Sequence, residues 1–352
     1  PMPHDDATLL RCRFAQTEDA VRPLTLVSAD GLEDWRAALP AEQGVWADAQ
    51  GFKAALGETL VLPAGDGGVA AAVIGVGTPQ QRNRKRDGAV AGAGRLPAGV
   101  YRIEGHPDDF DLSGFCLGWL LSEYRYDRYA SQGAPKAHLL APSNVDAAQI
   151  EAIAAGEVLT RDLINTPASD MGPDALEATI HALGSAFDAT VTTVMGEDLV
   201  QGYPLIHTVG RASSTAPRLV ELTWGDVGPK LTLVGKGVCF DTGGLNIKPG
   251  ASMGLMKKDM GGAAAVLGLA RMIMALELPL QLRVLVPAVE NAISGSAFRP
   301  QDILTSRKGL TVEINNTDAE GRLALAEALA LAEEEQPELL ISMATLTGAA
   351  RV

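Results

Sequence analysis

The chain has 352 residues, a formal net charge of −14 at pH 7 and an apolar fraction of 47%. A chain of this length can bury a large core and is more typical of two domains than of one. The acidic balance argues against general affinity for nucleic acids and for anionic membrane surfaces.

Cysteine usage and hydropathy bear on where the protein works. Cys12, Cys116 and Cys239 are widely spaced and show no paired metal-binding pattern. Such thiols suit a reducing compartment. We find no signal-peptide core and no apolar run long enough to span a bilayer. We therefore expect a cytoplasmic protein that does not bind membranes.

Residues 1–142 are predicted to form a smaller N-terminal α/β domain with short elements. Apolar runs predict strands at 24–28, 59–62, 71–76, 99–103 and 137–140, and helices at 32–38, 47–55 and 117–129. A basic cluster from Arg82 to Arg86 is expected to be a solvated loop rather than a phosphate contact. We find no catalytic constellation in this half of the sequence.

Residues 143–166 are predicted to form a connecting helix, which the prolines and glycine of the segment 165–173 end. Residues 167–352 form the second domain, in which strands and helices alternate. We expect helices at 173–185, 261–276 and 323–335, and strands at 190–194, 206–209, 218–223, 230–234, 281–289, 310–314 and 339–343. This order indicates an α/β domain with a central mixed sheet flanked by helices. Because such a sheet rarely ends just after a strand, we expect the domain to continue past Val352.

Asp318, Glu320 and Arg322 lie on the connection between a predicted strand and the next helix. Folds of the α/β class usually place their chemistry on such connections. Two carboxylates that turn toward one point repel each other unless a cation lies between them. The alternative is an acidic helix start, in which Thr317 or Asp318 caps the helix and the helix dipole favours Glu320.

A second group of polar residues follows the strand at 230–234 and opens a later helix; its members are Lys236, Asp241, Lys248 and Asp259. Taken singly, each has an ordinary explanation as a surface lysine, a turn residue or a helix cap. If both groups meet at one sheet edge, four carboxylates share a small volume and cannot all be ionised without compensation. Two divalent cations bridged by shared carboxylates would supply that compensation.

The five histidines are scattered, and none adjoins these loops. The metal ligands would therefore be mainly oxygens, which suit Mn and Mg as well as Zn. The lack of a nearby histidine and of a G-x-S-x-G motif argues against a Ser-His-Asp hydrolase.

Three segments of this half resemble the leucyl (cytosol) aminopeptidase family. They are VGKGVCFDTGGLNIKP at 234–249, KKDMGGAAAV at 257–266 and NTDAEGRLALAEAL at 316–329. ATLTGA at 344–349 and NTPASDMGP at 165–173 give weaker support. The resemblance covers roughly residues 155–352, and it implies a catalytic peptidase domain there.

The resemblance also implies roles for individual residues. Asp241 and Glu320 would bridge two divalent metal ions, Zn or Mn with Mg as a third option. Asp318 would complete one site, and Lys236 and Asp259 the other, with Lys236 neutral because a cation at bonding distance lowers its pKa. Lys248 would polarise the scissile carbonyl and stabilise the oxyanion. Arg322 would hold a bicarbonate ion that acts as the general base.

The substrate pocket is predicted from the same likeness and from position along the chain. Its residues would be Lys248, Asp259, Met256, Thr345, Thr347 and Gly348, with Met253 as a further candidate in its wall. Met256 is equally well explained as core packing.

The implied function is hydrolysis of the N-terminal residue, of leucine type, from peptides with a free α-amine, by an enzyme that assembles as a homohexamer. The first alternative is a non-catalytic DNA-binding or scaffolding relative, which only the basic cluster supports and the net charge opposes. The second is a related hydrolase that acts on another amide, such as a Cys-Gly dipeptide.

Overall fold

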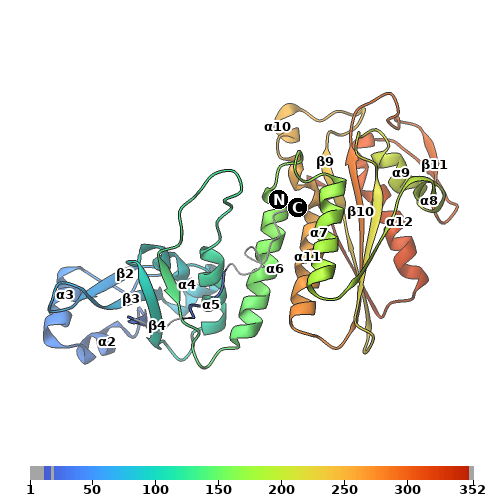
Figure 1. The fold of residues 1–352 in the computed structure, drawn as a ribbon. Helices are drawn as coiled ribbons and strands as arrows, with labels where there is room; N and C mark the ends of the chain where they lie inside the picture. The colour runs from blue at the N-terminus through green and yellow to red at the C-terminus, as the bar shows by residue number, and fades with distance from the viewer. Residues whose placement is uncertain (1–11, 17–19, 349–352) are drawn as a thin grey trace. The chain divides into compact units, whose positions relative to one another are not determined.

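Residues 12–16 and 20–348 are described by the computed structural model shown in Figure 1. The described chain up to Ala154 forms one compact unit, and the chain from Ala155 onward forms another. Helix α6, Ala147–Asn165, contains the division between them. The finer division at 142 and 166 stays a prediction. Ala349, which belongs to the ATLTGA segment, lies outside the described residues.

The N-terminal unit is built on a five-stranded sheet with strand order β2-β3-β1-β4-β5, in which only the β2–β3 pair is antiparallel. The strands are β1 Arg22–Ser28, β2 Thr59–Pro63, β3 Val69–Gly77, β4 Gly99–Gly105 and β5 Ala137–Leu139. The helices are α2 Leu32–Ala38, α3 Ala41–Ala49, α4 Pro79–Arg84, the 3-10 helix η1 Ala89–Arg95 and α5 Leu112–Ser122. The strands and α2 therefore lie where the sequence predicts them.

Two helices of this unit differ from the prediction. Helix α3 ends at Ala49 instead of reaching residue 55, because Gly51 and Ala54 both adopt positive φ, which a helix cannot contain. Helix α5 begins at Leu112 rather than 117, because the Asp111 side chain accepts a hydrogen bond from the backbone N–H of Gly114 at 2.9 Å and caps the helix there.

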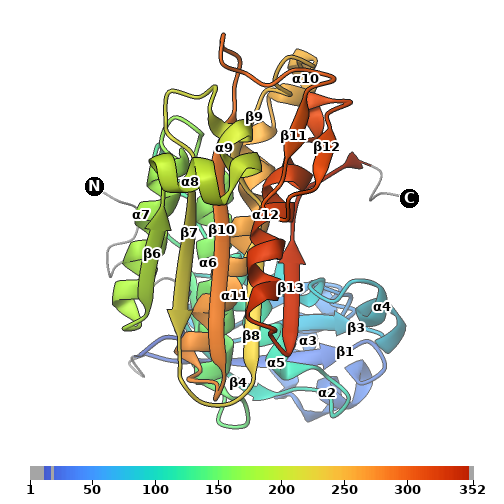
Figure 2. The same ribbon diagram turned by 90° about the vertical axis from the view of Figure 1, so that its right-hand side faces the viewer.

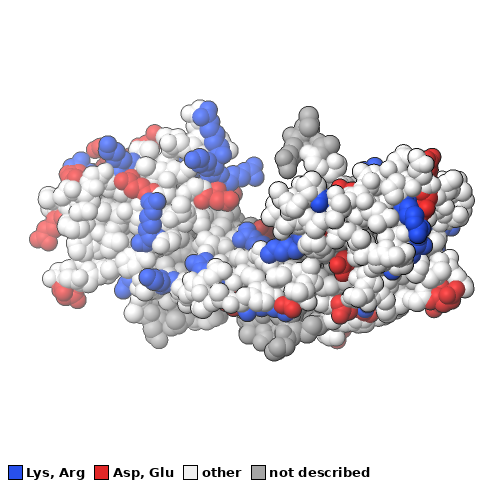
Figure 3. All heavy atoms as spheres, turned by 90° about the horizontal axis from the view of Figure 1, so that it is seen from above, with Lys and Arg blue, Asp and Glu red and all other residues white. Residues whose placement is uncertain are grey.

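The basic cluster from Arg82 to Arg86 begins in helix α4, so a loop throughout was wrong, but the cluster is solvated as expected, since Arg84, Lys85 and Arg86 are exposed. Thr78 and Gln81 form a capping box at the start of α4, and Pro79 takes its first position. Arg82 is also engaged, since its guanidinium lies 2.5 Å from Asp109 and over the Phe110 ring. Figure 3 shows basic and acidic side chains interspersed over the face that it presents of each unit.

The C-terminal unit is built on a six-stranded mixed sheet with strand order β13-β8-β10-β7-β6, and β9 pairs with β10. Strands β8, β9, β10 and β13 are parallel, and β7 is antiparallel to both β10 and β6. The strands are β6 Thr190–Val194, β7 Arg218–Trp224, β8 Lys230–Gly235, β9 Gly237–Asp241, β10 Gln281–Asn291 and β13 Leu339–Met343. A separate hairpin pairs β11 Ile303–Thr305 with β12 Thr311–Glu313. The mixed sheet of the prediction is confirmed.

Helices cover both faces of this sheet, as Figure 2 shows, with α8, α9 and α12 in front and α6 and α11 behind. The helices are α7 Pro173–Ala186, α8 Gly196–Gly202, α9 Pro204–Gly210, α10 Gly250–Met253, α11 Gly261–Ala275 and α12 Gly321–Glu334, with 3-10 helices η2 Met256–Met260 and η3 Thr317–Ala319. Successive residues of β10 enter opposite layers: Val284 packs with α7 and α11, and Leu285 packs with α9 and α12. The central strands are therefore buried on both faces, which explains their unbroken apolar sequence.

One predicted strand of this unit was wrong. The run 206–209 belongs to helix α9, because Pro204 starts a helix whose buried face includes Ile206 and Val209. After Gly235 the chain resumes as β9, which pairs with the same strand as β8, namely β10. Among the described helices, none is long and apolar enough to cross a membrane.

Truncation of a side chain in the layered core should destabilise this unit. Leu222 of β7 is fully buried, and Leu222→Ala is expected to lower the free energy of unfolding by about 2–5 kcal/mol, because it leaves a cavity. Leu310→Ala is the control; its side chain is 65% exposed, and a change below about 0.5 kcal/mol is expected. Urea unfolding followed by circular dichroism measures both, and equal losses would contradict this description of the core.

Candidate metal centre

The predicted metal ligands and Lys248 come together at the carboxyl ends of the parallel strands. Asp241 is the last residue of β9, and Thr345 follows the end of β13. Asp259 lies in η2, just before α11, and Glu320 lies between η3 and α12. Open α/β sheets bind ligands at this edge, because the connections after parallel strands all emerge there.

Lys236 occupies the break between β8 and β9. Its backbone N–H donates to the carbonyl of Met343 at 3.0 Å, and its carbonyl accepts from the N–H of Ala263 at 2.9 Å. At Lys236, these two bonds take the place of the backbone hydrogen bonds that β8 and β9 make with β10. The side chain is thereby directed into the sheet edge, where it is only 2% exposed.

The Lys236 ammonium joins two carboxylates. Its Nζ lies 2.8 Å from Asp259 Oδ2 and 3.0 Å from Glu320 Oε1, and it donates to the backbone carbonyl of Thr345 at 2.9 Å. Gly321 makes this approach feasible, since a Cβ at that position would lie 2.3 Å from Lys236 Cε. A side chain there would force the lysine or the start of α12 to move.

Lys248 joins the other two carboxylates in the same way. Its Nζ lies 2.9 Å from Asp241 Oδ2 and 2.5 Å from Asp318 Oδ1. Gly243 allows the loop that carries Lys248 to fold back, because its φ of +85° is one that other residues rarely adopt. The backbone N–H of Gly243 also donates to Asp241 Oδ1 at 2.8 Å.

Burial and charge change the acidity of this array. Burial raises the pKa of Glu320 to about 7, opposed by Lys236 and reinforced by Asp241 and Asp259. Burial likewise raises the pKa of Asp318. Burial disfavours both ammonium groups, but the neighbouring carboxylates outweigh it and raise the pKa of Lys236 and Lys248. In this arrangement the two lysines supply the positive charge that the carboxylates need.

The donor set fits divalent cations. One carboxylate oxygen each from Asp241, Asp259 and Glu320 lies within 4.8 Å of the other two, and all three residues are buried. Asp318 Oδ1 and Glu320 Oε1 are buried and touch lysine ammonium groups, yet neither accepts a hydrogen bond of good geometry within the described chain. Oxygens in this condition can serve as ligands of Mn, Mg or Zn.

The acidic helix start is not what these carboxylates form. Asn316, rather than Thr317 or Asp318, caps η3 by accepting from the N–H of Asp318 at 2.8 Å. Glu320 stands at the cap position of α12 but makes no capping hydrogen bond with its side chain. Its carboxylate instead contacts Lys236, as described above.

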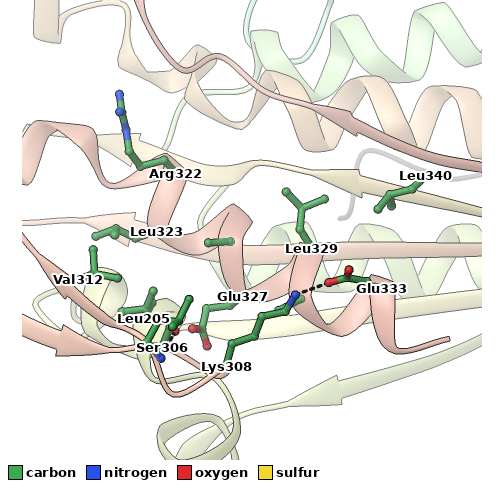
Figure 4. Close-up of a pocket in the computed structure, with 13 residues that line it drawn as sticks. Leu205, Ser306, Lys308, Val312, Arg322, Leu323, Glu327, Leu329, Glu333 and Leu340 are labelled. Atoms are coloured by element: carbon green, nitrogen blue, oxygen red, sulfur yellow. Dashed lines mark hydrogen bonds and ion pairs between the residues drawn. The ribbon is translucent and has the colours of Figure 1, made fainter. Parts of the chain in front are cut away.

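Arg322 does not join the array. Its side chain is exposed, and no ion pair or hydrogen bond within the described chain links it to the four carboxylates. It lines a cavity of about 670 Å³ over α12 and the β11–β12 hairpin. Figure 4 shows its guanidinium at the opposite end of this cavity from the Lys308–Glu333 ion pair, pointing away from them.

The residues predicted to bind substrate lie at different depths. Thr345 is part of the array, because its Oγ1 donates to Asp259 Oδ1 at 2.8 Å. Met253 and Met256 are half-buried in the segment that leads to Asp259, whereas Thr347 and Gly348 are exposed. Both interpretations of Met256, as pocket wall and as core packing, stay predictions.

Three further residues, which sequence reasoning missed, connect the loops of the site. Asn291 ends β10 and donates from Nδ2 to Asp241 Oδ1 at 2.8 Å and to the carbonyl of Thr317 at 3.0 Å. The backbone N–H of Asn246 donates to Thr317 Oγ1, and the backbone N–H of Thr317 donates to Asn246 Oδ1, both at 2.8 Å. A polar residue at the carboxyl end of a long apolar strand was the signal that could have identified Asn291.

Comparisons with known proteins agree with this geometry. The model of the cytosol aminopeptidase family catalytic domain matches residues 158–352, and that of the M17 aminopeptidase N-terminal domain matches residues 22–142. A probable cytosol aminopeptidase of Syntrophotalea carbinolica is 38% identical over 349 residues, which span 90% of this chain and 70% of that protein.

Two solved structures extend the likeness to the whole fold. The crystal structure of cytosol aminopeptidase from Coxiella burnetii is 41% identical with a TM-score of 0.89, covering 97% of this chain and 74% of that one. The bottromycin maturation enzyme BotP in complex with Mn is 32% identical with a TM-score of 0.82, covering 94% of this chain and 73% of that one. The chain belongs to the cytosol aminopeptidase family, a family of hydrolases.

Proposed function

We propose that this chain is a metal-dependent aminopeptidase that removes the N-terminal residue, of leucine type, from peptides with a free α-amine. The observation that carries the proposal is the meeting of Asp241, Asp259 and Glu320 at one buried point of the sheet edge. Further support comes from the family to which the chain belongs and from BotP, a relative whose structure was solved with Mn.

Two divalent cations, Zn or Mn with Mg as a third option, would be held by Asp241, Asp259, Asp318, Glu320 and Lys236. When bound, they would polarise the scissile carbonyl and lower the pKa of water. Lys236 must lose its proton to act as a ligand, and the dication would replace the charge that its ammonium places between Asp259 and Glu320. Asp241 and Glu320 would supply carboxylate ligands to both cations.

Lys248 and Arg322 would carry the remaining charge chemistry. Lys248 would stay cationic, and when the cations take over its present contacts with Asp241 and Asp318 its ammonium would be free to donate to the oxyanion that forms at the scissile carbonyl. The exposed Arg322 guanidinium, which no described carboxylate engages, suits a small anion such as bicarbonate. A bicarbonate held there would accept a proton, a role for which no histidine of the site is available.

The substrate would be oriented at its N-terminus. Asp259, with Thr345 fixed against it, borders the position proposed for the α-amine. Met256, Thr347 and Gly348 would border the first side chain, and the last two are exposed. The preference for leucine rests on the names of relatives, among them leucyl aminopeptidases of trypanosomes.

A homohexamer in the cytoplasm is the expected state of the enzyme and remains a proposal. The relatives named cytosol aminopeptidases support the location. The DNA-binding or scaffolding alternative is not favoured, because the chain belongs to a family of aminopeptidases and carries a net charge of −14.

Removal of metal should abolish activity reversibly. We expect the purified protein to lose hydrolysis of leucine-p-nitroanilide on chelation and to regain it with Mn or Zn, because the carboxylate array holds the cations. Asp318→Asn should remain inactive after metal is restored, since it removes an anionic ligand. Asp226→Asn, at an exposed turn, is the control and should behave as the wild type. Full activity in the presence of chelator would contradict the proposal.

Loss of the Lys248 charge should affect the chemical step. Lys248→Met is expected to lower kcat by about 10²–10³-fold, because one oxyanion-stabilising donor is removed. Lys230→Met removes an exposed lysine at the start of β8 and should leave kcat unchanged. Steady-state kinetics at saturating metal measures kcat for both variants. A wild-type kcat in Lys248→Met would remove this residue from the mechanism.

A further inference from the structure

Asn291 lies beneath the carboxylate array and is not one of the residues that would hold a metal. Its side chain is 1% exposed, and its backbone carbonyl accepts from the N–H and the Oγ1 of Thr242, which anchors it at the end of β10. The main chain of Asn291 is therefore held in place, and its side-chain amide is directed toward the carboxylate array.

Both hydrogens of the Asn291 amide are used. One is donated to Asp241 Oδ1 at 2.8 Å and the other to the carbonyl of Thr317 at 3.0 Å. Both partners are acceptors, so the reverse orientation of the amide would place three oxygens against one another. The hydrogen-bond pattern thus determines which atom of Asn291 faces the site.

This arrangement gives the two oxygens of Asp241 different tasks. Oδ1 accepts from Asn291 and from the N–H of Gly243, both at 2.8 Å, and so is fully engaged by neutral donors. Oδ2 faces Lys248 at 2.9 Å, toward the other carboxylates. The carboxylate plane is thereby fixed, with one oxygen left for chemistry.

The second hydrogen bond of Asn291 holds the other half of the array. Thr317 precedes Asp318 and is fully buried, and its Oγ1 donates to the carbonyl of Gly243 at 2.7 Å. Asn291 therefore sets the spacing between Asp241 on β9 and the segment that carries Asp318 and Glu320.

We propose that Asn291 is a positioning residue that fixes Asp241 Oδ2 and the Thr317–Glu320 segment in the geometry required to bind the metal pair. This inference rests on the proposed function. Partners that orient a metal ligand through its second atom typically alter metal affinity by about 10–100-fold when they are removed. Loss of the Asn291 side chain should therefore lower the affinity for metal, and it should lower catalysis only as a consequence of that weaker binding.

The test is a Mn²⁺ titration of the full chain against a chelating dye, with activity measured at each metal concentration. Asn291→Leu keeps the side-chain size and removes both donors, and it should raise the Kd for Mn²⁺ by about 10–100-fold. Asn291→Ser keeps one donor and should have an intermediate effect. In both variants the KM for the peptide should stay unchanged, while kcat at limiting metal falls.

The matched control is Thr179→Val, which removes another buried hydrogen-bonding side chain, in α7 and outside the array. It should bind Mn²⁺ as the wild type does. A wild-type Kd in Asn291→Leu, or failure of both Asn291 variants to fold, would assign the residue to stability alone and overturn the proposal. Absence of Mn²⁺ binding by the wild type would end the proposed function, and this inference with it.

Discussion

Repulsion among four carboxylates that share one edge of the sheet is the constraint on which the rest of the C-terminal unit depends. Two lysines offset this repulsion: Lys236 lies between Asp259 and Glu320, and Lys248 lies between Asp241 and Asp318. Each pairing needs close approach, which the missing side chain of Gly321 permits for the first. The start of α12 therefore accommodates the charge array through the absence of a side chain at Gly321.

The fold supplies the rigid positioning and the buried surroundings of this array. A sheet buried on both faces holds the ends of β8, β9, β10 and β13 in fixed register, so residues distant in sequence meet without freedom to separate. The low-dielectric surroundings strengthen each charge interaction and make an uncompensated carboxylate costly. A buried, anionic and rigid site of this kind is suited to cations, and in a family of peptidases it is suited to hydrolysis.

Much of this was accessible from the sequence because the residues that carry charge are concentrated in short Gly-rich connections. The segment 316–322 and the positions of Lys236, Asp241, Lys248 and Asp259 indicated a metal site on the condition that the two loop groups meet, and the structure brings them together. The strands were predictable for a similar reason, since their apolar runs are long and bounded by turn residues.

The remaining features depend on tertiary contacts that periodicity does not encode. The run 206–209 is apolar and short, and only the start at Pro204 and its packing decide that it is helical. Lys236 breaks a strand through hydrogen bonds to Met343 and Ala263, both remote in sequence. Asn291 was missed because its partners, Asp241 and Thr317, become neighbours only when the sheet is assembled.

The most direct measurement of the central claim is the anomalous scattering of crystals grown with Mn²⁺. We expect two Mn²⁺ peaks per chain, enclosed by Asp241, Asp259, Asp318, Glu320 and Lys236, with both lysine-bridged pairs of carboxylates rearranged around them. Peaks elsewhere, or crystals saturated with Mn²⁺ in which Lys236 and Lys248 keep their present ion pairs and no peak lies among these residues, would contradict it.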